Sequence, residues 1–340
     1  MRPKILVILT NLGGPDSLGA VRPFLFNLFY DRAILRLPNP FRFLLAVFIS
    51  LKRSKKSKRI YSLMGGRSPI LKNTLEQARA LKKSLEKDFE VLVVPAMRYW
   101  RPRAKDVLEV LGGFNPSRVV LLPLYPQFST TTTLSSIEEW KKVAPQWQEK
   151  TVTRCCYFND PDFIGAHQKL ISPILEEAIK HGVPRILFSA HGLPKKIVDD
   201  GDPYQGQVEA TVTSIMKNFK NTDYAICYQS RVGSLEWIGP SIDEELKRAA
   251  KHNRAVVVVP VSFVSEHSET LVELDIDYAK KAKEWGVPFY GRVPALGDNP
   301  LYIKCLEKSV RLLIEGGSIL GLDCLGRSCL LTREGCCWRG

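Results

Sequence analysis

The stretch Arg185–Pro194, RILFSAHGLP, predicts one strand of the fold and points to a candidate site. Its apolar run at 186–188 favours an extended backbone, and Gly192 and Pro194 end that run, which predicts a buried strand followed by a loop. His191 lies in this loop, at the edge of an open α/β sheet where ligands bind. A neutral imidazole there can accept a proton or bind a metal, although a loop histidine bonded to the backbone is the alternative.

Strand and helix signals alternate along the whole chain of 340 residues. The predicted strands are Lys4–Thr10, Glu90–Met97, Arg118–Leu124, Thr151–Tyr157, the run from Arg185, Asp223–Tyr228, Arg254–Val259 and Pro288–Val293. Helical patterns separate them, and such alternation predicts parallel sheets with helices on both faces. We therefore predict an α/β fold with two similar Rossmann-like lobes, each a four-stranded parallel sheet flanked by helices.

The predicted lobes are residues 1–150 and residues 151–315, followed by a cysteine-rich tail at 316–340. We expect a cleft between the carboxyl edges of the two sheets, because ligands bind at that edge of an open α/β sheet. The first lobe would carry the lip of this cleft, and the second would carry His191.

The formal net charge of +14 suggests an anionic partner, which is a nucleic acid, an acidic membrane surface or an acidic small molecule. The basic residues concentrate at Lys52–Arg59 and no nucleic-acid recognition module is present, so we expect no nucleic-acid partner. Arg2 and Lys4 lead directly into a strand, and no stretch is apolar enough to span a bilayer, so a cytoplasmic location is expected. Eight cysteines without a secretion signal argue against a disulfide scaffold.

The segment Phe41–Leu51, FRFLLAVFISL, is followed directly by the basic run KRSKKSKR at Lys52–Arg59. An apolar helix beside a basic run is typical of an interfacial membrane contact. The alternative is a buried helix followed by a solvated basic turn. The first interpretation predicts peripheral association with an anionic membrane surface.

A second group of candidate residues lies on the helix predicted for His267–Trp285. Glu269, Glu273 and Asp277 are spaced by four residues and would form one acidic ridge. Like charges at this spacing repel, so the ridge is reasonable if a cation or shared protons occupy it. An ordinary solvated helix face is the alternative.

Several segments resemble, in the same order, those of the ferrochelatase family. They are LTNLGGPDS at 9–17, YSLMGGRSPI at 61–70, RYWRP at 98–102, LYPQFSTTTT at 124–133, SAHGLP at 189–194, SFVSEHSETLVELDIDYA at 262–279 and RVPALGDNP at 292–300. The resemblance runs from about residue 9 to residue 312. An ordered series of segments is far more specific than any one motif.

The resemblance implies an enzyme that inserts ferrous iron, its substrate, into a porphyrin to give haem. It makes His191 the metal-facing residue and proton acceptor, and Glu269 the carboxylate that completes the iron site. Glu273 and Asp277 match an acidic path for protons or metal. Alternatives are cobalt insertion or another tetrapyrrole chelatase, and a non-catalytic haem or porphyrin carrier.

The resemblance also implies residues that hold the macrocycle. These are Arg98, Tyr99, Tyr125, Gln127, Phe128 and Tyr30, with Asn11, Arg32 and Arg67 at the rim of the pocket. Aromatic walls suit a flat ring and arginine suits its propionates. The apolar lip at Phe41–Leu51 favours protoporphyrin IX, with coproporphyrin III the alternative. The oligomeric state is open, and a homodimer is one alternative.

The tail carries the third signal, because Cys329, Cys336 and Cys337 lie within nine residues. Some members of the family bind a [2Fe–2S] cluster through such tail cysteines and one internal cysteine, which here is Cys156 or Cys155. The adjacent pair 336–337 departs from the usual spacing of the family. A structural zinc or free thiols are the alternatives.

Overall fold

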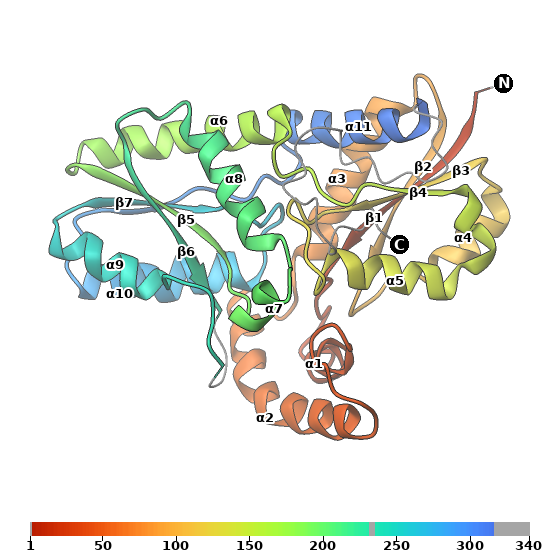
Figure 1. Ribbon diagram of the computed structural model, residues 1–340, viewed down its shortest axis with the longest axis horizontal. Coiled ribbons are helices and arrows are strands. Elements are labelled where there is room, and N and C mark those ends of the chain that lie inside the picture. Colours follow the sequence, from red (N-terminus) through yellow and green to blue (C-terminus); the bar gives the residue numbers. More distant parts are fainter. Residues whose placement is uncertain (1, 231–234, 316–340) are drawn as a thin grey trace. The chain divides into compact units, whose positions relative to one another are not determined.

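The computed structural model describes residues 2–230 and 235–315, which form two compact units. The first unit comprises residues 2–156 and 306–315, and the second comprises residues 157–230 and 235–305. Each unit contains one four-stranded sheet in which all neighbouring strands are parallel (Figure 1). The predicted α/β architecture of two such sheets flanked by helices is therefore confirmed.

The sheet of the first unit has the strand order β2-β1-β3-β4. Its strands are β1 (Lys4–Asn11), β2 (Glu90–Met97), β3 (Arg118–Pro123) and β4 (Thr151–Thr153). The helices are α1 (Val21–Tyr30), α2 (Phe41–Leu63), α3 (Ile70–Leu85), α4 (Val107–Phe114) and α5 (Thr133–Val143), with a 3₁₀-helix η1 (Pro145–Lys150). The central strand β1 is apolar and fully buried over residues 5–9, as expected for a parallel sheet with helices on both faces.

The sheet of the second unit has the strand order β6-β5-β7-β8. Its strands are β5 (Pro184–His191), β6 (Asp223–Gln229), β7 (Ala255–Pro260) and β8 (Tyr290–Arg292). Its helices are α6 (Pro161–Ile179), α7 (Lys195–Asp199), α8 (Tyr204–Met216), α9 (Ile242–Lys251), the π-helix η2 (Glu269–Tyr278) and α10 (Ala279–Glu284). Helix α6 covers one face, and α9 and α10 cover the other (Figure 1). Helix α11 (Pro300–Glu315) begins in this unit and ends in the first.

Strand β4 is shorter than the predicted strand Thr151–Tyr157. Its pairing with β3 covers three residues, 151–153. Beyond them the Arg154 Nε donates a hydrogen bond to the carbonyl oxygen of Cys156, so the backbone turns away from the sheet. Cys155 and Cys156 consequently lie past the end of the strand, and both are buried.

Helix α2 is longer than the predicted apolar helix, because it continues through the basic run to Leu63. Lysine and arginine are good helix formers, and no glycine or proline interrupts the segment 41–63. The basic run is therefore part of the helix and not the turn that the alternative interpretation contained. None of the helices in residues 2–230 and 235–315 has both the length and the apolar character needed to cross a bilayer.

Two further helices differ from the prediction. The sequence predicts a helix at Thr211–Phe219, but helix α8 begins earlier, at Tyr204, because the Asp202 carboxylate accepts the backbone N–H of Tyr204 and Gly206 is accommodated within the helix. The helix predicted for His267–Trp285 is divided into the π-helix η2 and the α-helix α10.

Candidate active site

Parallel pairing in the second unit brings the candidate residues to one edge of the sheet. His191 ends β5 and lies opposite Gln229, the last residue of β6. His191 is therefore the final strand residue rather than a loop residue. Strand β7 ends at the same edge with Pro260, and the loop after it leads into η2, which begins with Glu269.

His191 and Glu269 form a hydrogen-bonded pair at this edge. The His191 Nδ1 lies 2.8 Å from the Glu269 Oε2, and 17 % of the Glu269 side chain is exposed. Burial favours a neutral imidazole, but the charge and hydrogen bond of Glu269 outweigh it, so the pKa of His191 is raised. Burial likewise disfavours the Glu269 carboxylate, but the facing His191 holds the pKa of Glu269 well below its usual value. Because Nδ1 faces Glu269, Nε2 is the ring nitrogen left for a substrate.

Gln229 holds the π-helix from the edge strand β6. The Ser189 hydroxyl donates to the Gln229 Oε1 at 2.7 Å, which orients the amide group. Its Nε2 then donates to the carbonyl oxygen of Glu269 at 3.1 Å and to the Glu273 Oε2 at 3.2 Å. No motif in the sequence indicated a role for Gln229. Gln229 ends a strand that runs parallel to β5, and this position could have indicated that it lies beside His191.

Glu273 accepts a second hydrogen bond, from the Ser230 hydroxyl at 2.8 Å. Burial and then the Glu269 charge raise the pKa of Glu273 to about 7, against the hydrogen bonds that favour its carboxylate. Asp277, one position further along the ridge, is exposed. An ordinary solvated helix face therefore describes Asp277 but not Glu269 or Glu273. The role of the ridge as a path stays a prediction.

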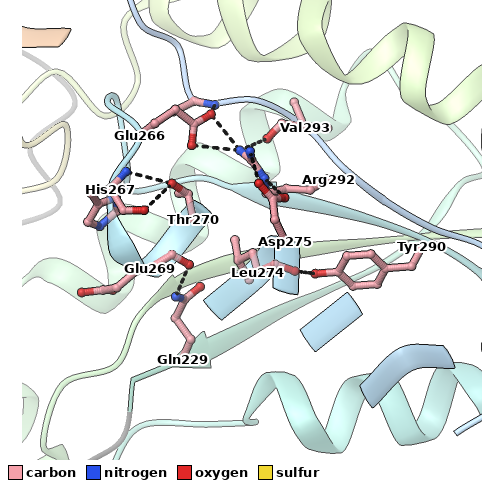
Figure 2. Close-up of polar contacts among 11 residues, drawn as sticks. Gln229, Glu266, His267, Glu269, Thr270, Leu274, Asp275, Tyr290, Arg292 and Val293 are labelled. Carbon is pink, nitrogen blue, oxygen red and sulfur yellow. Dashed lines mark hydrogen bonds and ion pairs between the residues drawn. The ribbon is translucent and has the colours of Figure 1, made fainter. Parts of the chain in front are cut away.

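Glu269 and Glu273 both lie on the π-helix η2, a rare conformation that is frequent at functional sites. Figure 2 shows the Gln229 side chain bonded to the carbonyl oxygen of Glu269. His267 lies just before η2, and its backbone N–H donates to the Thr270 Oγ1 at 3.0 Å. The His267 ring is buried, its Nδ1 has no hydrogen-bond partner, and burial lowers its pKa, so it is neutral. The sequence analysis assigned His267 no role, although it lies two residues before Glu269.

In the first unit Arg98 lies in a network of carboxylates. Its guanidinium contacts the Asp31 Oδ2 at 2.8 Å and the Glu139 Oε2 at 3.2 Å, and its Nε donates to the Ser135 hydroxyl at 2.7 Å. The Tyr99 hydroxyl donates to the Asp31 Oδ2 at 2.8 Å. Each of the three guanidinium nitrogens of Arg98 thus contacts a side chain of the same unit.

The other predicted substrate-binding residues also lie in contact with the rest of the first unit. Burial raises the pKa of Tyr125, and Gln127 and Phe128 are buried. The Tyr30 ring stacks on Phe26, with the centroids 5.4 Å apart. The roles of Arg98, Tyr99, Tyr125, Gln127, Phe128 and Tyr30 in substrate binding stay predictions.

The candidate metal ligands outside this edge are cysteines. Cys155 and Cys156 are buried thiols with their Sγ atoms 3.7 Å apart. Cys329, Cys336 and Cys337 lie outside the described residues. Within residues 2–230 and 235–315, no three histidine, cysteine or acidic side chains gather as a metal site would require.

The sequence model of the family described as Ferrochelatase matches residues 4–312. The chain belongs to the ferrochelatase family. It is 54 % identical over 309 residues to the ferrochelatase of Wolbachia sp. subsp. Drosophila simulans (strain wRi), a match that covers 89 % of this chain and 97 % of that protein. It is 52 % identical over 312 residues to the ferrochelatase of Phenylobacterium zucineum, covering 90 % of each chain.

Solved structures with the same fold include a more distant chelatase. SirB from Bacillus subtilis with Fe³⁺ matches with a TM-score of 0.56 and 13 % identity, covering 93 % of this chain and 98 % of that one. The sirohydrochlorin chelatase SirB from Bacillus subtilis subspecies spizizenii, in complex with cobalt, matches with a TM-score of 0.54 and 12 % identity, covering 93 % and 97 %. At such identities the likeness shows the fold alone.

We expect Glu273→Gln to gain stability over the wild type as the pH rises. With a pKa of about 7 folded against 4.5 unfolded, Glu273 keeps the folded chain more protonated between these values. The stability this provides is complete below the unfolded pKa and is lost as the pH rises through the folded pKa, whereas glutamine does not titrate.

Urea unfolding of both proteins from about pH 5 to about pH 8 measures this difference. Asp277→Asn, at an exposed position of the same ridge, is the control. A free-energy difference between wild type and Glu273→Gln that stays constant with pH would contradict the prediction.

Proposed function

We propose that this protein inserts ferrous iron into a porphyrin to form haem, the terminal step of haem synthesis. Membership of the ferrochelatase family supports this function. The observation that carries it is the His191–Glu269 pair at the carboxyl edge of the sheet. A histidine nitrogen and a carboxylate oxygen suit a divalent first-row metal. Two protein ligands, rather than a closed set of four, suit an ion that leaves with the product.

The pair also provides the base that metallation needs. Iron insertion releases two pyrrole N–H protons for each Fe²⁺ that enters the ring. Because Glu269 raises the pKa of His191, the imidazole is a stronger proton acceptor than it would be alone. Glu273, with a pKa of about 7, can accept and release a proton near neutrality, and the exposed Asp277 would pass it to solvent.

The porphyrin that we propose is protoporphyrin IX, the more apolar of the two candidates. The exposed apolar side chains of α2 support this assignment, since they form a surface suited to a membrane-soluble substrate. Coproporphyrin III, with more propionates, is the alternative. Comparing turnover of the two porphyrins decides between them.

The alternative functions fit the observations less well. A cobalt chelatase has the same fold, but the relatives that match almost the whole chain at about half identity are described as ferrochelatases. A non-catalytic carrier of haem or porphyrin would not need the His191–Glu269 pair or the raised pKa of Glu273.

We expect His191→Ala to abolish metallation while the protein stays folded. Loss of a general base lowers kcat on the order of 100-fold or more. Glu269→Gln should lose most activity because it removes the charge that makes His191 basic, and Glu273→Gln should lose less. The assay follows the visible spectrum after Fe²⁺ and protoporphyrin IX are mixed under reducing, anaerobic conditions.

His252→Ala, at an exposed histidine, is the control for this series. Circular dichroism confirms that each variant is folded. Turnover at the wild-type rate by a folded His191→Ala protein would exclude the proposed mechanism.

We also propose that α2 attaches the protein to an anionic membrane surface. Phe41, Leu44, Phe48 and Leu51 are 50–65 % exposed and are spaced by three or four residues, which places them on one stripe of the helix. The basic run at 52–59 continues the same helix. An exposed apolar stripe that continues into lysines and arginines has the pattern of an interfacial helix.

Changing Lys55, Lys56, Lys58 and Arg59 to glutamine should strongly reduce flotation with phosphatidylserine vesicles, since each basic residue contributes about 1 kcal/mol at such a surface. Added salt should weaken wild-type binding in the same way. The control changes four exposed lysines of the same unit, namely Lys72, Lys82, Lys83 and Lys87. Equal flotation of both variants would assign binding to net charge and not to α2.

We further propose a [2Fe–2S] cluster bound by Cys329, Cys336, Cys337 and one of Cys156 and Cys155. Four thiolates hold such a cluster, and the two internal thiols lie beside each other just past β4. Binding would tie the tail to the first unit and add to its stability. A structural zinc is the alternative occupant.

Anaerobically purified protein should be red-brown, with iron and acid-labile sulfide in equal amounts. Cys336→Ser should remove the colour, whereas Cys227→Ser and Cys305→Ser, at buried positions of the second unit, should not. Colourless protein with one zinc would support the alternative. Loss of colour with Cys324→Ser would show a different set of four ligands.

A further inference from the structure

The π-helix η2 is held by side chains of the edge strand β8, opposite the edge strand that carries Gln229 (Figure 2). The Tyr290 hydroxyl donates to the carbonyl oxygen of Leu274 at 2.8 Å. The Arg292 Nη2 donates to the Asp275 Oδ2 at 2.7 Å. Strand β8 therefore contacts η2 through two of its three residues.

Arg292 also bonds to the segment that precedes η2. Its Nη1 donates to both carboxylate oxygens of Glu266, at 2.8 and 3.1 Å. The backbone N–H of Ala295 donates to the same carboxylate at 2.9 Å, which fixes its position. The Arg292 side chain is 11 % exposed, so solvent screens these ion pairs less than it screens surface pairs.

The two carboxylates that Arg292 joins, Glu266 and Asp275, lie on either side of Glu269 and Glu273 in the sequence. Glu266 lies three residues before Glu269, and Asp275 lies two residues after Glu273. One planar guanidinium therefore connects Glu266, which precedes η2, to Asp275, which lies within η2. A lysine ammonium does not reproduce this geometry. Without it, Glu266 and Asp275 would face each other as like charges.

We propose that Arg292 is a positioning residue, which holds η2 so that Glu269 stays within hydrogen-bonding distance of His191. This inference rests on the proposed function, because Glu269 is taken as a metal-binding carboxylate. A π-helix is rarer than an α-helix, so contacts from outside the helix are a reasonable source of its stability. Arg292 touches neither His191 nor Glu269, and acts only through the segment it holds.

The second unit offers a matched control in Arg185. Its guanidinium also pairs with two carboxylates, Glu245 at 2.7 Å and Asp223 at 3.2 Å, and its side chain is 7 % exposed. Arg185 lies near the start of β5, whereas His191 ends that strand. Loss of Arg185 should therefore destabilise the same unit without moving the candidate ligands.

The experiment measures KM for Fe²⁺, KM for protoporphyrin IX and Tm in Arg292→Met, Arg292→Lys and Arg185→Met. Contacts that orient metal ligands typically change metal affinity by about 10-fold or more, so Arg292→Met should raise KM for Fe²⁺ by about 10-fold. KM for protoporphyrin IX should stay unchanged, and Arg292→Lys should recover only part of the loss. Arg185→Met should lower Tm and leave both KM values at those of the wild type.

Amide hydrogen exchange over residues 267–278 provides a readout that does not depend on activity. Exchange should accelerate in Arg292→Met and not in Arg185→Met. Unchanged exchange and an unchanged KM for Fe²⁺ in folded Arg292→Met would overturn the proposal. If Arg292→Met does not fold, Asp275→Asn tests the same contact and leaves Arg292 paired with Glu266. If the wild type itself lacks metallation, the proposed function fails, and the exchange data alone decide the role of Arg292.

Discussion

Parallel strand pairing in the second unit is the constraint on which the candidate site depends. Because β5, β6 and β7 run in the same direction, their carboxyl ends meet at one edge. His191, Gln229 and Glu269 reach this edge from positions far apart in the sequence, and each comes from or follows a different strand. An antiparallel strand in this sheet would have placed its last residue at the opposite edge.

The same edge shows how burial and charge together determine protonation. Burial disfavours both carboxylates, Glu269 and Glu273, but the facing His191 lowers the pKa of Glu269, whereas the Glu269 charge adds to burial in raising the pKa of Glu273. Glu269 faces His191 and stays ionised, whereas Glu273 accepts hydrogen bonds from the neutral groups of Gln229 and Ser230 and has a pKa of about 7. Two carboxylates four residues apart in the sequence thereby have different pKa values.

In the first unit the charged groups compensate one another instead. Arg98 pairs with Asp31 and Glu139, and the Glu139 carboxylate also pairs with Arg103 at 2.6 Å. Tyr99 and Ser135 add hydrogen bonds to Asp31. A buried network of this kind tolerates the loss of one member poorly, because the remaining charges lose their partners. Loss of Arg98 should therefore destabilise this unit whether or not Arg98 also contacts a substrate.

The amino-acid pattern was enough to predict the two sheets and to indicate His191 and Glu269. Apolar runs such as 5–9 and 255–259 predicted buried strands, because a strand that is covered on both faces is apolar along its whole length. The ordered motifs indicated the family. The sequence did not predict the π-helix, the raised pKa of Glu273 or the contacts of Gln229 and Arg292, which are seen only in the folded structure. These depend on groups that meet across dozens of residues of sequence, as Ser189 meets Gln229, and no local pattern encodes such a meeting. The exposure of the apolar side chains of α2 could not be predicted from the sequence either. An apolar helix has the same sequence pattern whether or not another element covers it.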